Sequence, residues 1–314
     1  MSEFTFLAYD QVCGDEKLDI LRKYGNKCIM TDFAILLGGL AYSDTNKKER
    51  IGNWWTKSYD LYGGHQVIII TEDKYEFIHT VNALNYWYGA RPAIPYSAIN
   101  KPFSKYKTGG KRALREVEYG EYPQTVVDEK NTHKLERLRR KDMLQETGKN
   151  YTIPQLDRYR RNQASCKEYE YEGKKYIRFI ADLSSENKVL SDGRKIQYNK
   201  AYWLQVEPIT WLVDVKTQIA LAEKILFSGV AFEMRFTNNP TRDFNKTNIK
   251  QFMDDYFSKE IIPSTKTINL EKPSIPLDKD SKESKNDLDF TMNSLSEETK
   301  DPEYTFQKVK KLKF

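Results

Sequence analysis

The chain has 314 residues, a formal net charge of +6 and a 39% share of hydrophobic residues, so it holds enough apolar material for a packed core. No stretch approaches the roughly 20 apolar residues of a membrane-spanning helix, and the first ten residues lack the pattern of a secretory signal. The three cysteines are widely separated, which argues against a disulfide framework. We therefore expect a soluble, cytoplasmic protein that does not insert into membranes.

The aromatic residues, mostly 21 Tyr and 15 Phe, favour strands over isolated helices, so we expect an α+β fold of mixed antiparallel sheets with a few helices. Two short helices are predicted near the N-terminus. The first covers Glu16 to Lys23 and ends at Gly25. The second begins at the capping pair Thr31-Asp32 and ends at Gly38.

The next segment predicts a β-hairpin with strands at residues 65–71 and 74–81. Residues 97–113 are polar and without period, which indicates a loop or a domain seam. A strand over Arg115 to Tyr119 should then end at Gly120 and Pro123, because both residues interrupt regular pairing.

A charged helix is predicted over Asp128 to Glu146, with Gly148 in the stop position. Alternating residues on both sides of Gly173 predict a hairpin over residues 168–180. Three further strands are predicted over 202–206, 210–215 and 219–226, separated by Pro208 and by a turn at 214–217, and they should form an antiparallel meander. An amphipathic helix over 249–261 should dock on the sheet.

Composition divides the chain into three predicted regions. Residues 1–112 form an N-terminal α+β region, and residues 113–263 form a β-rich region with a charged helical insert at 128–163. Residues 264–314 are dominated by Lys, Asp, Glu, Ser and Asn, so we expect this tail to be disordered or ordered only on a partner.

A dense aromatic group lies between residues 54 and 88. We interpret Trp55 and Trp87 as core residues, whereas the others either pack in the core or line a groove. Arg91, next to the stiff Pro92, either offers a fixed donor to a ligand or ties a strand end to the core. The predicted ligand-binding residues are Trp54, Tyr59, Tyr62, Tyr86, Tyr88 and Arg91.

Motifs for catalysis or metal binding are not found. The patterns GxSxG, HExxH and GxGxxG do not occur, and the acidic residues are scattered. His65 and His79 would face each other across the predicted hairpin only if its turn had three residues, and a zinc site needs further ligands. We predict no catalytic residues, no metal and no cofactor.

Residues 130–162 carry ten basic residues against four acidic ones, an excess equal to the formal charge of the whole chain. Such a segment is typical of a surface that tracks phosphates, and it is equally typical of a solvated helix face. The predicted nucleic-acid-binding residues are Arg137, Arg139, Arg140, Lys141, Arg158, Arg160 and Arg161.

Several short motifs resemble the signatures of a large, uncharacterised bacterial domain family. The segments 54–58 (WWTKS) and 88–93 (YGARPA) resemble its pattern WWLRS followed by GVRPA. The segments 119–124 (YGEYPQ), 208–213 (PITWLV) and 219–221 (IAL) resemble its pattern FGxYPQ, PIxWxVL and LLxS. In the family the second block precedes the first, so the reversed order here implies permutation, duplication or two half-domains.

That family is similar to the formylglycine-generating, sulfatase-modifying group, and the resemblance therefore implies a C-type-lectin-like α+β scaffold. The catalytic cysteine pattern of that group is absent around Cys166. We predict a non-catalytic binding or interaction module whose ligand or protein partner is unknown. The alternative is a DNA- or RNA-binding protein of phage or mobile-element origin that acts through residues 130–162.

Overall fold

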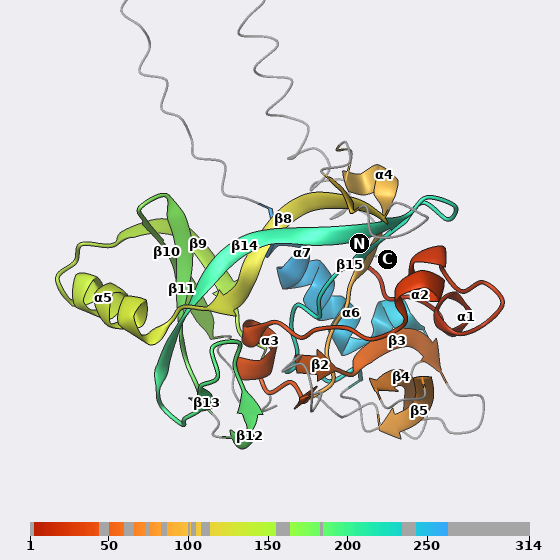
Figure 1. Ribbon diagram of the computed structural model, residues 1–314, viewed down its shortest axis with the longest axis horizontal. Coiled ribbons are helices and arrows are strands. Elements are labelled where there is room, and N and C mark those ends of the chain that lie inside the picture. Colours follow the sequence, from red (N-terminus) through yellow and green to blue (C-terminus); the bar gives the residue numbers. More distant parts are fainter. Residues whose placement is uncertain are drawn as a thin grey trace, which may run out of the picture. The chain divides into compact units, whose positions relative to one another are not determined.

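Runs of antiparallel strands and a few short helices make up the described chain (Figure 1), which confirms the predicted α+β class. The computed structural model describes residues 3–43, 50–59, 66–72, 76–82, 87–99, 101, 105–107, 114–154, 164–182, 185–233 and 243–262. Residues Ser2–Ser264 form one compact unit.

The main sheet is organised around one long strand, β14 (Ala201–Asp214). β8 (Leu114–Val126) pairs with it along most of its length, while β11 (Lys174–Ile180) and β15 (Ile219–Ala222) pair with successive parts of it. The sheet continues from β11 to β10 (Ser165–Tyr171) and β9 (Gln145–Thr152), and from β15 to β6 (Ala93–Pro95). β7 (Lys105–Lys107) pairs with β8.

The prediction that Gly120, Pro123 and Pro208 end their strands is wrong. Each lies inside β8 or β14, and the register between the two strands shifts at two places instead, between Gln205 and Val206 and between Pro208 and Thr210. These shifts are β-bulges, which absorb residues that a regular ladder cannot hold. Gly120 adopts a φ of +73°, a conformation that glycine tolerates best.

The hairpin predicted over residues 168–180 is confirmed. β10 and β11 pair antiparallel with Tyr171 opposite Lys174. The two turn residues, Glu172 and Gly173, both have positive φ, as the tight turn of a twisted hairpin requires.

The charged helix is shorter than predicted. α5 (Glu129–Arg140) begins at Asp128, whose side chain accepts a hydrogen bond from the Asn131 backbone. The predicted stop at Gly148 is wrong, because Gln145–Thr152 forms β9 and Gly148 lies within this strand. The first six positions of β9 are polar and not buried, so the segment has no strong strand signal of its own, and pairing with the neighbouring β10 selects the strand.

Three short helices precede the first strands, and two of them match the prediction. α1 (Tyr9–Val12) was not predicted, whereas α2 (Asp19–Tyr24) ends at Gly25, and α3 (Asp32–Leu36) begins at Thr31, whose side chain accepts from the Ala34 backbone. Asp32 is almost fully buried and joins distant segments. Its carboxylate accepts from the Val126 and Ser191 backbones and pairs with Arg50.

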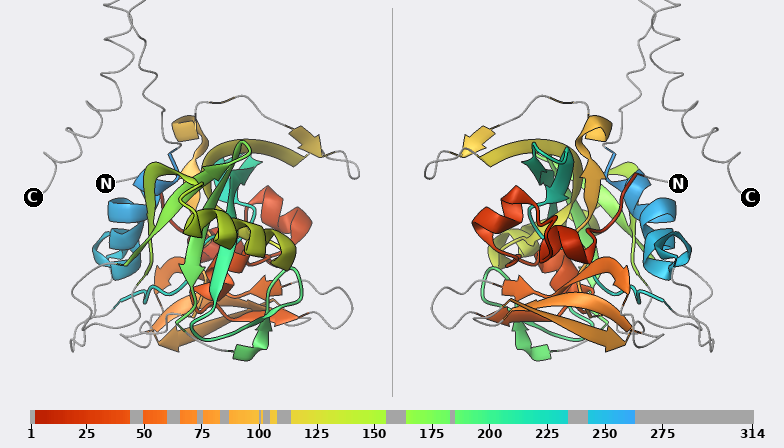
Figure 2. Two further views of the ribbon diagram at one scale, coloured as in Figure 1. Left: turned by 90° about the vertical axis from the view of Figure 1, so that its left-hand side faces the viewer. Right: turned by 90° about the vertical axis from the view of Figure 1, so that its right-hand side faces the viewer.

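The predicted C-terminal helix is present as three consecutive pieces, α6 (Asn248–Phe252), the π-helical turn η2 (Met253–Phe257) and α7 (Ser258–Glu260). A short 3₁₀ turn, Phe244–Lys246, precedes it. The helix docks as expected, since Phe257 makes an edge-to-face contact with Tyr122 of β8 at 5.1 Å between ring centroids. Figure 2 shows α6 and α7 on one side of the main sheet and α1 and α2 on the other.

Three smaller sheets complete the described structure. β3 (Trp54–Tyr59), β4 (Gln66–Glu72) and β5 (Glu76–Asn82) form one, which confirms the predicted hairpin at β4 and β5. β1 (Ala41–Ser43) pairs with β2 (Arg50–Gly52), and β12 (Ser185–Val189) pairs with β13 (Lys195–Ile196). His79 lies opposite Ile69 in the hairpin register, and His65 is outside the described residues.

The region predicted as a loop, 97–113, contains the end of α4 (Tyr96–Ile99) and the whole of β7. The boundary predicted after residue 112 therefore falls between two paired strands, β7 and β8, and Ser2–Ser264 are not divided there. The predicted tail, 264–314, lies outside the described residues. In the described part of the chain, no helix is long and apolar enough to cross a membrane.

Candidate functional site

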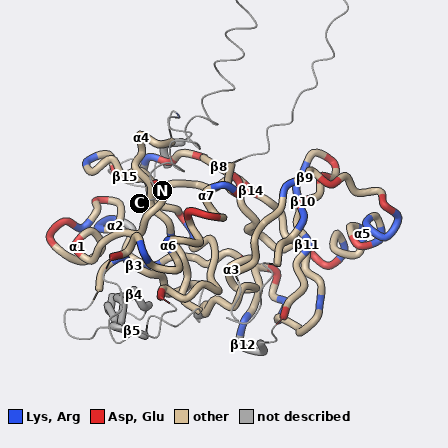
Figure 3. Tube along the Cα trace, turned by 180° about the vertical axis from the view of Figure 1, so that it is seen from behind, with Lys and Arg blue, Asp and Glu red and all other residues tan. Residues whose placement is uncertain are grey.

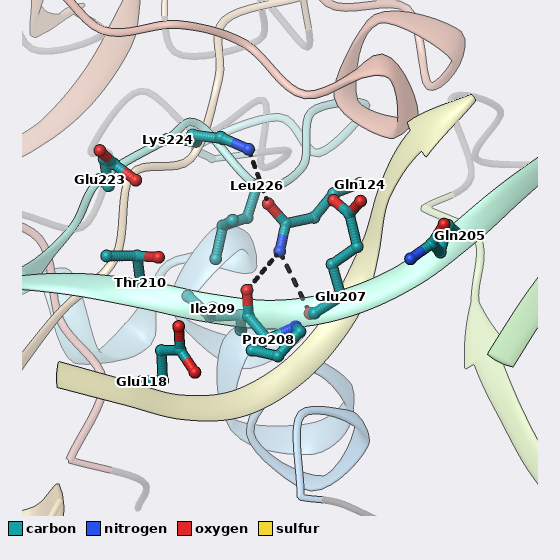
Figure 4. Close-up of a pocket in the computed structure, with 10 residues that line it drawn as sticks. All are labelled: Glu118, Gln124, Gln205, Glu207, Pro208, Ile209, Thr210, Glu223, Lys224 and Leu226. Carbon is teal, nitrogen blue, oxygen red and sulfur yellow. Dashed lines mark hydrogen bonds between the residues drawn. The ribbon is translucent and has the colours of Figure 1, made fainter. Parts of the chain in front are cut away.

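A polar pocket of about 310 Å³ opens where β8, β14 and the segment after β15 meet (Figure 4). Its lining comes from short stretches of all three, and four of its ten residues, Gln124, Pro208, Ile209 and Thr210, lie in the motifs compared above with a bacterial family. The lining residues are Glu118, Gln124, Gln205, Glu207, Pro208, Ile209, Thr210, Glu223, Lys224 and Leu226.

Gln124 organises the wall of this pocket. It is the extra residue at one of the β8 bulges, and its side chain is almost completely buried. Its amide Nε2 donates to the carbonyl oxygens of Glu207 at 3.2 Å and Pro208 at 2.9 Å. The Gln124 amide thus donates hydrogen bonds to carbonyls beside the bulge, where the regular strand pairing is interrupted. This role explains why a glutamine follows Tyr122 and Pro123, opposite the strand that contains Pro208.

The other end of Gln124 reaches the third wall. Its Oε1 accepts from the Lys224 ammonium at 3.3 Å, as the dashed lines of Figure 4 show. The Glu223 backbone N–H donates to the Thr210 carbonyl at 2.9 Å and fixes this segment against β14. The pocket is therefore built on paired strands, which favours a preformed site.

Carboxylates dominate the charge of the pocket lining, with Glu118, Glu207 and Glu223 against the single cation Lys224. Glu207 Oε2 accepts from the Thr125 hydroxyl at 2.8 Å, which holds the carboxylate in place. Glu118 is exposed at the rim. The balance of charge favours a positively charged group in this space.

The structure places two of the predicted ligand-binding residues in the core. Trp54 is fully buried, and its indole N–H donates to the Asn26 carbonyl at 3.1 Å. The Arg91 guanidinium is buried too and lies 5.1 Å from the Trp54 ring centroid, while its Nε donates to the Ala222 carbonyl. Arg91 therefore ties the chain before β6 to the end of β15 and does not face solvent.

Burial changes the pKa values of Arg91 and of its neighbour Cys28. Burial lowers the pKa of Arg91, although the nearby Cys28 and Glu223 oppose the change. Burial also raises the pKa of the Cys28 thiol, whose Sγ donates to the Glu223 carbonyl. Cys28 is accordingly held as a neutral thiol at neutral pH. All three cysteines are free.

The remaining aromatic candidates are only partly brought together. Tyr59 and Tyr88 are half-buried, and each makes an edge-to-face contact with a buried ring, with centroid distances of 5.7 Å from Tyr59 to Phe232 and 5.1 Å from Tyr88 to Trp55. Trp87 is half-buried, although a core position was predicted for it. Tyr62 and Tyr86 lie outside the described residues.

The predicted nucleic-acid-binding residues also differ in where the structure places them. Arg137, Arg140 and Lys141 are exposed on or next to α5, while Arg139 is half-buried and contacts Glu136 at 3.4 Å. Arg158, Arg160 and Arg161 lie outside the described residues.

Sequence reasoning did not select the residues of the pocket as candidates. Gln124, Glu207 and Lys224 are ordinary polar residues on three separate segments, and no local pattern places them together. The available signal was the resemblance itself, because its YPQ and PIxW motifs supply Gln124 and Pro208. Among the described residues, no group of three or more His, Cys, Asp or Glu side chains could hold a metal ion. Comparisons of the chain with protein-family models, curated proteins and solved structures found no match.

Proposed function

We propose that the protein is a non-catalytic binding module and that the pocket between β8, β14 and residues 223–226 holds a positively charged group of its ligand. The observation that carries the proposal is the convergence of three carboxylates on one pocket whose wall is fixed by Gln124. An alkylammonium or a guanidinium group matches that charge and size. The absence of known catalytic motifs from the sequence supports binding over catalysis.

The proposal includes a C-type-lectin-like scaffold in permuted order. The two motif blocks contact each other directly, since Ala93 of β6 lies opposite Leu221 of β15 in the register of the two paired strands. A permuted chain would keep such contacts while changing the order of its segments. The three free cysteines support a cytoplasmic location as part of the same proposal.

Calorimetric titration of the full chain with arginine amide tests the proposal, with butyrate as the anionic comparison. We expect arginine amide to bind and butyrate not to bind. The double variant Glu118→Gln/Glu207→Gln keeps the shape of both side chains and removes two charges, so its affinity should fall about tenfold or more.

The matched control is Glu16→Gln/Glu129→Gln, which removes two exposed carboxylates that do not line the pocket. It should bind arginine amide like the unmodified chain. Equal losses in the two double variants, or no heat of binding with arginine amide at millimolar concentrations, would contradict the proposal.

A further inference from the structure

The exposed side of α5 carries a continuous stripe of basic side chains. At 100° per residue, five positions fall within one third of the helix circumference, and all five are exposed. We call this set the α5 stripe, and it consists of Lys130, His133, Arg137, Arg140 and Lys141. Figure 3 shows α5 at one end of the described unit with its basic residues in blue. A hollow of about 260 Å³ lies beside the stripe, lined by His133, Glu136, Arg137, Arg140 and Lys141.

Both acidic side chains of α5, Glu129 and Glu136, have cationic partners outside the stripe. Glu136 accepts from Arg178 at 2.5 Å and from the Trp203 indole at 3.0 Å. Burial opposes ionisation of this carboxyl, but the bonds from Arg178 and Trp203 outweigh it and lower the Glu136 pKa. Glu129 lies 3.9 Å from Lys200.

No carboxylate in the described part of the chain forms an ion pair with Lys130, Arg137, Arg140 or Lys141. Lys134, which lies just outside the stripe, differs: its ammonium contacts Glu172 at 3.1 Å and lies over the Tyr171 ring. The stripe is therefore the part of α5 whose positive charge is not neutralised within the described structure.

Helix stability does not account for the whole stripe. Arg137 and Arg140 lie in the last turn, where they interact favourably with the helix dipole. Lys130 lies in the first turn, where a positive charge is unfavourable. The buried side of α5, with Thr132, Leu135 and Leu138, already anchors the helix.

We propose that the α5 stripe binds the phosphate backbone of a nucleic acid. From Lys130 to Arg140 the helix rises about 15 Å, which is long enough for its basic side chains to contact several phosphates of a nucleic-acid backbone. Side chains on one face of a helix can contact such a row without reading bases, so the binding is expected to be independent of sequence. The inference does not depend on the pocket described above.

Fluorescence anisotropy of the full chain with labelled 20-base-pair duplexes of DNA and of RNA tests this inference. With about four cationic contacts, the slope of log affinity against log salt should be about −3.6, and affinity should fall roughly 100-fold between 50 and 200 mM salt. The triple variant Arg137→Gln/Arg140→Gln/Lys141→Gln should reduce the slope to about −1. The duplex that shows this pattern identifies the class of nucleic acid.

The control is Lys195→Gln/Lys216→Gln/Lys259→Gln, which removes the same charge from exposed lysines on β13, on the turn after β14 and on α7. It should keep at least two thirds of the slope. The inference is overturned if neither duplex binds at 25 mM salt, or if the control triple lowers affinity as much as the stripe triple. Circular dichroism of both triples checks that these surface changes leave the fold intact.

Discussion

At the scale of single residues, Glu260 at the end of α7 makes the stability of the fold depend on pH. Burial is the main cause that raises the pKa of its carboxyl from 4.5 to about 7, and the hydrogen bonds with Thr152 oppose the change. One carboxylate oxygen accepts from the Thr152 backbone of β9 at 2.7 Å, and the other is buried without a hydrogen-bond partner. The neutral carboxyl is thus favoured in the folded chain.

This shift predicts a loss of stability as the pH rises. Between about pH 4.5 and 7 the unfolded chain releases the Glu260 proton while the folded chain retains it, so the free energy of unfolding falls with increasing pH. The effect is on the order of 3 kcal/mol by pH 7. Glu260→Gln should remove that part of the pH dependence, which urea unfolding at pH 5 and pH 7.5 can measure. An identical pH dependence in the variant and the unmodified chain would refute the assignment.

Residue identity alone did not predict which polar groups are buried. Arg91 fits a ligand-binding role by its chemistry, yet Trp54, Ala222 and the surrounding core enclose it. Asp32 fits a helix start, yet its carboxylate joins α3 to β8, Ser191 and Arg50. These contacts join residues far apart in the chain, and no local propensity encodes them.

At the scale of elements, Gly120 shows why one bulge of β8 requires a glycine. A side chain there would place its Cβ 2.9 Å from the Ile261 carbonyl oxygen, and the backbone already has a φ of +73°. The neighbouring Glu121 N–H donates to that same carbonyl at 2.7 Å. The bulge therefore brings the C-terminal helix close to the sheet.

We predict that Gly120→Ala destabilises the chain by about 2–3 kcal/mol, from backbone strain together with the clash. Gly193→Ala is the matched control, since its φ is +87° and no atom lies within 4 Å of the added Cβ. It should cost only about 1 kcal/mol. Thermal unfolding of both variants gives the comparison, and equal costs would show that the contact with Ile261 has no role.

Elements with strong local signals were predicted well, and those governed by tertiary pairing were not. The hairpin at Glu172-Gly173 and the helix cap at Thr31 are encoded by neighbouring residues. The continuity of β14 through Pro208 depends instead on a bulge opposite β8 and on the Gln124 side chain. Likewise β9 pairs with β10, although its mostly polar sequence gives no strong local signal for a strand.

At the scale of the whole molecule, contacts cross the division that composition suggested at residue 112. β6 pairs with β15, and β7 pairs with β8. The four fully buried tryptophans, two from β3 and two from β14, lie on both sides of this division. We therefore predict that residues 2–264 unfold in one cooperative transition.

Urea unfolding followed by tryptophan fluorescence and by far-ultraviolet circular dichroism measures this cooperativity. The two signals should give the same midpoint and the same slope. Two separate transitions, or midpoints that differ between the signals, would indicate that the regions before and after residue 112 fold independently.

The pocket also depends on contacts between distant parts of the chain, since Gln124 in its β8 wall lies 84 residues before Pro208 and 100 residues before Lys224 in the other two walls. The charges of its lining and the buried Gln124 support the binding of a cation. Sequence alone could supply the motifs, whereas only the packing of β8, β14 and residues 223–226 places their side chains in one space.

The most direct test of this account is to map amide chemical shifts of the full chain during titration with arginine amide. The account predicts saturable shifts centred on Gln124, Thr210 and Lys224, with none centred on the aromatic residues Tyr59 and Tyr88. Shifts that are absent, or that gather around Tyr59 and Tyr88 while the pocket signals stay fixed, would contradict it.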